Sequence, residues 1–256
     1  MWTADALASE AVAYAGEIWR VVESQARKST LRIADNLLEQ QILEEEIETV
    51  KPILPKGVDH LDPLLRTPFR YAPYPDGSRF RRAGQPEGVY YASEAVETAI
   101  AEQAFLSVLL VTESPGMILP SRPVEYSAFA VDVDADLVVD LTKPPLVKDA
   151  EVWTHPSDYR PCQDMADHAR EGGVQAIRYQ SARDPHARAN IAVLTWKVFA
   201  SPQPKTFQTW HIFLRRTGVD VMREFPRTTM AFGAAAFAND PRVAHYFGSP
   251  LSPNSN

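Results

Sequence analysis

Apolar residues recur along the chain at two different spacings, and the change in spacing divides it. Over residues 3–28 and again over residues 29–51, apolar positions recur at helical intervals, so we predict two helices. Pro52 follows the second helix, and the segment after it is rich in proline, which is typical of a linker. We therefore expect a helical extension over residues 1–57. The pattern leaves open whether it is part of the core, a dimerising arm or an element that docks a partner.

Beyond the linker, apolar and polar residues alternate as they do in strands. The sequence "FAVDVDADLVVDL" (129–141) has two alternating segments around Asp134-Ala135-Asp136, which predicts a strand, a turn and a second strand. A hairpin is predicted in "FQTWHIFLRRTGVDVMREF", with its turn near Thr217-Gly218. Further strands are predicted over residues 174–179 and 190–199.

Two long helices interrupt these strands. One begins at Ser93, a suitable N-cap, and runs to about Val111; the other lies in "CQDMADHAREGG" and ends at Gly172-Gly173. Strands mixed irregularly with helices indicate an α+β fold. We expect one domain over residues 58–248, followed by a disordered tail over 249–256.

The composition is that of a soluble globular protein, with 45% hydrophobic and 23% charged residues in a chain of 256. No apolar run is long enough for a membrane span, and no secretory signal is visible. Cys162 is the only cysteine, which excludes an internal disulfide and a multi-cysteine zinc site. We therefore expect a cytoplasmic protein without a membrane partner.

The charge is acidic overall but basic in one place. A net charge of −7 argues against general nucleic-acid binding, which needs a basic surface. Between residues 66 and 82, however, five arginines accompany a single acid, Asp76. This island is either a solvated loop or a site for a small phosphorylated ligand.

Glu102 is the acidic residue whose position invites a functional interpretation. At 100° per residue it shares a helix face with Ala95, Ala99 and Phe105 and with the leucines at 106 and 109. A carboxylate in an apolar stripe is costly unless it is paired. It is therefore either half of a structural ion pair or a catalytic carboxylate at the back of a pocket.

Two other residue types, tyrosine and serine, lie where a ligand could be contacted. Tyr90 and Tyr91 end a strand and point to opposite sides, so one faces the core and the other can stack on a flat ligand. Ser181 follows a strand and is either a turn residue or a hydroxyl that contacts a ligand. The spacing of His168 and His186 does not suit a metal site, and neither a dinucleotide-binding glycine motif nor a P-loop occurs.

Together, four short motifs resemble the RES domain, which is named for its arginine, glutamate and serine. They are "GSRF" with Arg79, "GVYYAS" with Tyr91, "TAIAE" with Glu102 and "YQSAR" with Ser181. Each motif is weak by itself, but the four in this order are fairly specific. The resemblance covers about residues 60 to 245 and leaves the N-terminal extension outside it.

The resemblance implies a fold similar to ADP-ribosyltransferases, in which a split β-sheet frames a cleft for NAD⁺ as substrate, with no metal. Arg79 and Glu102 are then the catalytic residues. Arg79 also binds the phosphate of the dinucleotide, Tyr91 stacks on the leaving base or the adjacent ribose, and Ser181 hydrogen-bonds the ligand. Arg70, in "PFRYAP", either contacts phosphate or supports the site. Arg66, Arg81 and Arg82 are expected to be surface or supporting charges.

The same resemblance implies a toxin of a RES–Xre toxin–antitoxin system that consumes NAD⁺ by cleaving the nicotinamide–ribose bond, through hydrolysis or phosphorolysis. Its expected partner is an Xre-type antitoxin that covers the active site, in a homodimer or a hetero-oligomer, and any DNA contact then belongs to that partner. One alternative is transfer of ADP-ribose to a specific protein. The other is a non-catalytic module that binds a phosphorylated ligand through the arginine island.

Overall fold

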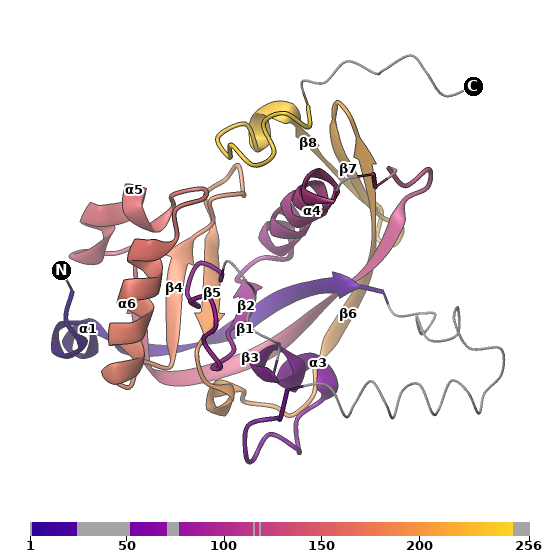
Figure 1. The fold of residues 1–256 in the computed structure, drawn as a ribbon. Helices are drawn as coiled ribbons and strands as arrows, with labels where there is room; N and C mark the ends of the chain where they lie inside the picture. The colour runs from indigo at the N-terminus through magenta and orange to yellow at the C-terminus, as the bar shows by residue number, and fades with distance from the viewer. Residues whose placement is uncertain (1, 25–51, 71–76, 115, 118, 248–256) are drawn as a thin grey trace.

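The computed structural model describes residues 2–24, 52–70, 77–114, 116–117 and 119–247 (Figure 1). Its α-helices are α1 (Ala4–Glu10), α3 (Pro63–Arg66), α4 (Val96–Glu113), α5 (Ala150–Trp153) and α6 (Arg160–Glu171). Its 3₁₀ helices are η2 (Thr67–Arg70), η3 (Leu146–Asp149), η4 (Trp196–Val198) and η5 (Ala234–Ala236). Its strands are β1 (Val12–Glu23), β2 (Tyr90–Ser93), β3 (Val124–Asp140), β4 (Ala176–Gln180), β5 (Ala189–Val193), β6 (Thr206–Arg215), β7 (Gly218–Arg223) and β8 (Thr228–Gly233).

The strands form one sheet that is split at β3. The strand order is β1-β2-β5-β4-β3-β6-β7-β8, and β1 pairs with β3 as well. One edge of β3 pairs with β1, while the other edge pairs with β6 over residues 124–130 and with β4 over residues 138–140. The β3–β4 pair is parallel and the other strand pairs are antiparallel. The expected α+β class with a split mixed sheet is therefore confirmed.

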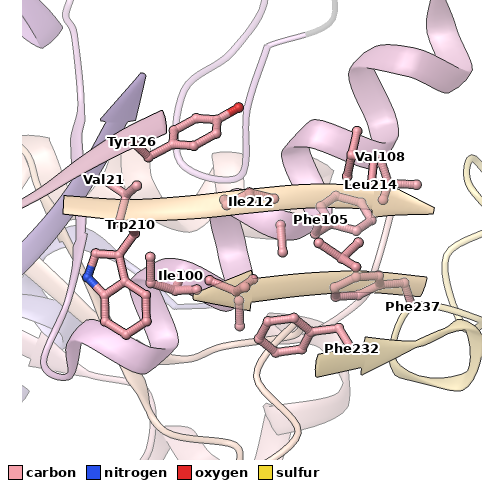
Figure 2. Packing of buried hydrophobic residues seen from close by; sticks show 14 of the residues in the cluster. Val21, Ile100, Phe105, Val108, Tyr126, Trp210, Ile212, Leu214, Phe232 and Phe237 are labelled. Carbon is pink, nitrogen blue, oxygen red and sulfur yellow. The ribbon is translucent and has the colours of Figure 1, made fainter. Parts of the chain in front are cut away.

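One helix, α4, lies across the split of the sheet, whereas α1 and α6 pack on its β4–β5 half. α4 contacts β1, β2, β5 and β6, and so reaches strands on both sides of the split (Figure 1). Its buried face packs with Trp210 and Phe232 of the β6–β8 half (Figure 2). α1 and α6 contact each other, and their buried side chains pack with Ile177 and Ala192 of β4 and β5. α4 thus brings its own residues to the junction between the two halves.

Of the two helices predicted before the linker, the first was expected over residues 3–28, and that prediction is wrong beyond residue 10. Only α1 is helical, and residues 12–23 form β1, which pairs along most of its length with β3. The physical reason is composition: "VAYAGEIWRVV" is rich in β-branched and aromatic residues, which favour strands. β1 therefore lies inside the sheet and not in a helical extension. The second predicted helix, over residues 29–51, lies outside the described residues, as does the tail over 249–256.

The predicted turn at Asp134-Ala135-Asp136 is also wrong, because β3 runs through it. Asp134 and Asp136 are exposed while Ala135 between them is buried. This is the alternation of a strand with one face toward solvent, so the two aspartates mark its outer face and not a turn.

The remaining elements agree with the pattern, with shifts at their ends. β4, the β6–β7 hairpin and α6 with its glycine C-cap are confirmed, and β5 covers the first part of its predicted strand. α4 begins at Val96, so Ser93 is the last residue of β2 and not a helix cap. Within the described ranges, no helix has both the length and the apolar character needed to cross a membrane.

Candidate active site

The loop that carries Arg79 is fixed by a tight turn and by contacts with α6. Gly77 has φ +72°, and a Cβ there would lie 2.6 Å from the Arg81 carbonyl oxygen, so the turn requires glycine. Gln163 of α6 donates to the carbonyl oxygens of Ser78 and Arg81 at 3.0 and 3.3 Å. The loop is therefore ordered on both sides of Arg79.

Arg79 itself is buried, with 9% of its surface exposed. Its Nη1 donates to the Trp153 carbonyl oxygen at 2.6 Å, and its guanidinium lies over the Tyr159 ring, 4.6 Å from the centroid. Burial by itself would lower the pKa of Arg79, but Tyr159, Cys162, Tyr179 and Glu102 act in the opposite direction, and its pKa lies above the usual value. Arg79 is thus a buried cation within electrostatic reach of Glu102.

The tyrosine pair divides as the strand alternation predicts. Tyr90 is fully buried and packs against Phe69 and Phe199. The Tyr91 hydroxyl accepts from the Phe80 backbone N–H at 2.9 Å and shares a hydrogen bond with Ser78 Oγ, also at 2.9 Å. Tyr91 therefore holds both neighbours of Arg79, a contact that its place in the sequence did not suggest. Its predicted stacking on a ligand stays a prediction.

Glu102 projects from α4 onto the ends of β4 and β5. Its Oε1 accepts two hydrogen bonds, one from Ser181 Oγ and one from Asn190 Nδ2, each at 2.6 Å. Ser181 is 2% and Asn190 1% exposed. Ser181 Oγ also accepts from the backbone N–H groups of Arg183 and Asp184, which closes the turn after β4. Two of the predicted residues, Glu102 and Ser181, are thus in direct contact.

Tyr179 of β4 connects the Glu102 contacts to the Arg79 loop. Its ring meets Phe80, the neighbour of Arg79, edge to face with centroids 4.8 Å apart. Burial raises the pKa of Tyr179 well above its usual value, and the charge of Glu102 raises it further. Tyr179 therefore keeps its proton beside the carboxylate. Arg79, Tyr91 and Glu102 are all distant from Tyr179 in the sequence, but in the fold they lie within electrostatic reach of it.

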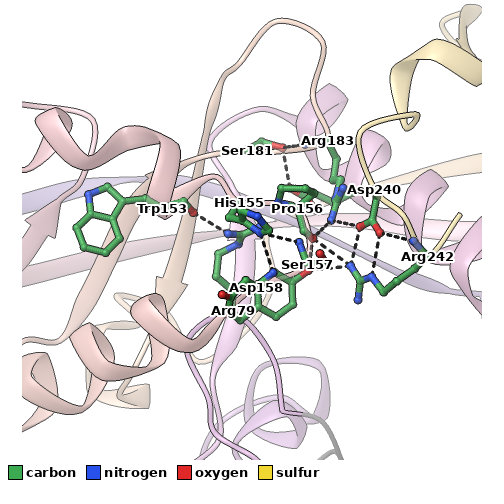
Figure 3. A network of polar contacts seen from close by, with 12 residues as sticks. Arg79, Trp153, His155, Pro156, Ser157, Asp158, Ser181, Arg183, Asp240 and Arg242 are labelled. Atoms are coloured by element: carbon green, nitrogen blue, oxygen red, sulfur yellow. Dashed lines mark hydrogen bonds and ion pairs between the residues drawn. The ribbon is translucent and has the colours of Figure 1, made fainter. Parts of the chain in front are cut away.

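A second polar group borders the site and joins three loops (Figure 3). Arg183 and Asp240 form an ion pair at 2.7 Å whose side chains are 4% and 0% exposed. Arg242 also pairs with Asp240, at 2.8 Å, and both arginines donate to the Pro156 carbonyl oxygen. The Arg183 guanidinium stacks on Phe105, one turn of α4 beyond Glu102, 3.6 Å from the ring centroid. We call Arg183, Asp240 and Arg242 the C-terminal clasp.

Three other arginines of the basic island make contacts within the protein. Arg81 is 3% exposed and donates to the carbonyl oxygens of Gln85 and Pro86, whereas Arg82 pairs with Asp164 and Asp167 on α6. Arg66 donates to the Asp59 carbonyl oxygen. Arg70 ends η2, and its predicted contact with phosphate stays a prediction.

Sequence reasoning missed Asn190, Tyr179 and the clasp. Asn190 is 88 residues from Glu102 and occupies a strand position where a polar residue attracts no notice. Tyr179 looked like an ordinary strand residue. The only local signal was the density of charged residues in "SARDPHAR", which contains Arg183.

No metal cluster accompanies these residues in the part of the chain that the structure describes. There, no three His, Cys, Asp or Glu side chains form a group that could hold an ion. That the chemistry needs no metal stays a prediction. Two surface pockets, of about 560 and 520 Å³, lie between α1 and α6 and on β6–β8, and neither is lined by Arg79 or Glu102.

Comparisons with known proteins identify the family of the chain. The chain matches the RES domain family over residues 55–215, which is more than half of its length and includes Arg79, Tyr91, Glu102 and Ser181. Among solved structures it is similar to a chain in the crystal structure of the M. tuberculosis MbcT–MbcA toxin–antitoxin complex. That similarity has 12% sequence identity and a TM-score of 0.45, and covers 81% of this chain and 92% of that chain. No curated protein matches the sequence.

Proposed function

The chain belongs to the RES domain family, and we propose on that basis that it consumes NAD⁺ by cleaving the bond between nicotinamide and ribose. The observation that carries the proposal is the placement of Glu102. Its carboxylate is held at the end of the sheet by two buried donors, and the Arg79 cation lies within electrostatic reach. An ordered carboxylate together with a buried arginine suits a substrate that joins a sugar to phosphates.

The carboxylate suits the charge that develops during cleavage. When the C1′–N bond breaks, its electron pair moves to the ring nitrogen, which neutralises the pyridinium and leaves positive charge on the ribose. That state resembles the oxocarbenium ion of glycoside cleavage. Glu102 stabilises it electrostatically and orients the ribose hydroxyls. Water then adds to C1′ and releases a proton, giving ADP-ribose and neutral nicotinamide; inorganic phosphate can add in place of water.

The other residues have supporting roles in this proposal. Arg79 offers a planar guanidinium for the pyrophosphate, since arginine binds phosphate oxygens in a bidentate manner. Tyr91 holds the loop that presents Arg79, and Ser181 holds Glu102. Nicotinamide leaves as a neutral molecule, so no strong general acid is needed.

We further propose that the chain is the toxin of a toxin–antitoxin pair. Loss of NAD⁺ would arrest growth, and an Xre-type antitoxin that covers the site would prevent this. The proposal rests on the family resemblance. The acidic chain, at −7, is compatible with leaving DNA contact to the antitoxin.

Incubation of the purified chain with NAD⁺ tests the enzymatic proposal. We expect nicotinamide to be released without any added protein acceptor. The second product is ADP-ribose if water is the acceptor and an ADP-ribose phosphate ester if the reaction depends on inorganic phosphate. Consumption of NAD⁺ only when an acceptor protein is supplied would show ADP-ribosyl transfer in place of degradation. No consumption under either condition would reject an NAD⁺-consuming enzyme.

A further inference from the structure

Three polar residues lie side by side across the sheet beneath Glu102. Asn190 of β5 is the direct partner of Ser93 on β2 and of Tyr179 on β4. Directly paired residues on neighbouring strands point to the same face of the sheet. The row Ser93, Asn190 and Tyr179 therefore underlies the point where α4 presents Glu102.

The hydrogen bonds along this row have a fixed direction. Ser93 Oγ donates to Asn190 Oδ1 at 2.7 Å, so the amide NH₂ group of Asn190 faces the other way and donates to Glu102 Oε1 at 2.6 Å. Ser93 is 2% and Asn190 1% exposed. Neither side chain can rotate without leaving a buried polar group unpaired, which costs about 1–3 kcal/mol.

The two carboxylate oxygens of Glu102 differ in their hydrogen bonds. Asn190 and Ser181 both donate to Oε1, and among the described residues none donates to Oε2. A carboxylate held through one oxygen has a fixed plane, and its second oxygen keeps all of its capacity to accept hydrogen bonds. Oε2 is therefore the oxygen that remains for a ligand.

We propose that Asn190 is a positioning residue, which holds Glu102 through Oε1 so that Oε2 faces the ribose of NAD⁺. This inference rests on the proposed NAD⁺ cleavage. Ser93 and Asn190 would then affect catalysis only by holding Glu102, without touching the substrate. An alternative role is structural only: the amide would satisfy a half-buried carboxylate and have no effect on the reaction.

Kinetics of three variants separate the two roles. Asn190→Ala removes a hydrogen bond to a charged group, so we expect kcat for nicotinamide release to fall about 10- to 100-fold while KM changes less than about threefold. Ser93→Ala frees the amide to rotate and should lower kcat by a smaller factor. Ser107→Ala is the control, because Ser107 is a buried hydroxyl on the same helix that bonds to Gln103 and Tyr126.

Asn190→Asp adds a readout that a purely structural residue would not change. The side chain keeps its shape but places a second carboxylate against Oε1. Two adjacent negative charges repel each other, so the pair takes up a proton at a higher pH than a single carboxylate does. We expect the acid limb of the pH profile of kcat to move to higher pH. Folding of each variant is checked by its melting temperature, and Asn190→Asp serves if Asn190→Ala does not fold.

The possible outcomes are distinct. If the wild-type chain releases nicotinamide and folded Asn190 variants keep its kcat and its pH profile, Asn190 is structural only and this inference is wrong. If the wild-type chain does not consume NAD⁺, the proposed function fails, and the role of Asn190 falls with it.

Discussion

The Tyr91 hydroxyl contacts both neighbours of Arg79, and so one aromatic side chain sets the position of the cation. It bonds to Ser78 Oγ and to the Phe80 backbone N–H, each at 2.9 Å. Burial raises the pKa of Tyr91, so the phenol stays neutral at physiological pH and can both donate and accept. A residue in this place acts on Arg79 through the loop.

Tyr91→Phe tests this role against stacking on the ligand. The variant keeps the ring but removes the hydroxyl, leaving the buried Phe80 N–H without its acceptor. We expect the free energy of unfolding to fall by about 1–3 kcal/mol and KM for NAD⁺ to rise severalfold, because Arg79 is less well held. Tyr126→Phe, which loses a hydroxyl contact in the other half of the sheet, should leave KM unchanged. An unchanged KM in folded Tyr91→Phe would favour stacking by the ring.

The sequence could nominate four residues for the candidate site, but it could not give their contacts. Arg79, Tyr91, Glu102 and Ser181 stand in short motifs that can be read locally. Asn190 cannot be found in this way, because its contact with Glu102 depends on how α4 lies over β5. Only the structure shows what Glu102 pairs with. Its hydrogen-bond partners are the neutral donors Ser181 and Asn190, whereas Arg79 interacts with it electrostatically.

At the scale of elements, the C-terminal clasp joins the segment after η5 to the turn that carries Ser181. Asp240 lies beyond the residues matched by the RES family, yet its carboxylate bonds to both Arg183 and Arg242. A buried ion pair is costly to break from one side, because the remaining charge is left without a partner. The segment around residue 240 is therefore tied to Arg183, whose backbone N–H bonds to Ser181 Oγ.

Asp240→Asn should lower the free energy of unfolding by about 3–5 kcal/mol. The matched control is Asp220→Asn, because Asp220 pairs with Arg215 on the surface and both side chains are about half exposed. This substitution should lower the free energy of unfolding by less than about 1 kcal/mol. Urea unfolding of the two variants measures the difference. Equal, small losses would mean that the clasp does not stabilise the fold.

The clasp also predicts a pH dependence of stability. Burial would raise the pKa of Asp240, but the hydrogen bonds from Arg242 and the charge of Arg183 outweigh it and lower that pKa below its usual value. A group whose pKa is lower when folded contributes stability above its unfolded pKa, near 3.9, and that contribution is lost as the pH falls further. We expect the stability difference between wild type and Asp240→Asn to be constant near pH 7 and to shrink below about pH 4. A difference that persists undiminished there would contradict this.

The elements that sequence patterns predicted poorly are those decided by long-range pairing. Residues 12–23 match a helical spacing at a few positions, but their partner is β3, more than a hundred residues away. α6 and the β6–β7 hairpin were predicted well because their signals, a glycine C-cap and a short turn, are local. Local patterns thus fixed the type of most elements, whereas the sheet order had to come from the fold.

At the scale of the whole molecule, β3 is the strand on which the two halves of the sheet meet. Its first part pairs with β6 and its last with β4, while β1 supports it along the other edge. α4 packs against both halves (Figure 1). Its Glu102 accepts hydrogen bonds from Ser181, directly after β4, and from Asn190 of β5. The candidate site thus depends on the split of the sheet, which brings residues from α4, β4 and β5 to one place.

The rate of nicotinamide release by the Glu102→Gln variant tests the central claim most directly. The substitution keeps the size of the side chain but removes the charge that is proposed to stabilise the ribose cation. Ser107→Ala is the control, and the variants are compared only if their melting temperatures equal that of the wild type. We predict a rate about 10²- to 10³-fold below wild type for Glu102→Gln and no change for Ser107→Ala. A folded Glu102→Gln variant that releases nicotinamide at the wild-type rate would contradict the account.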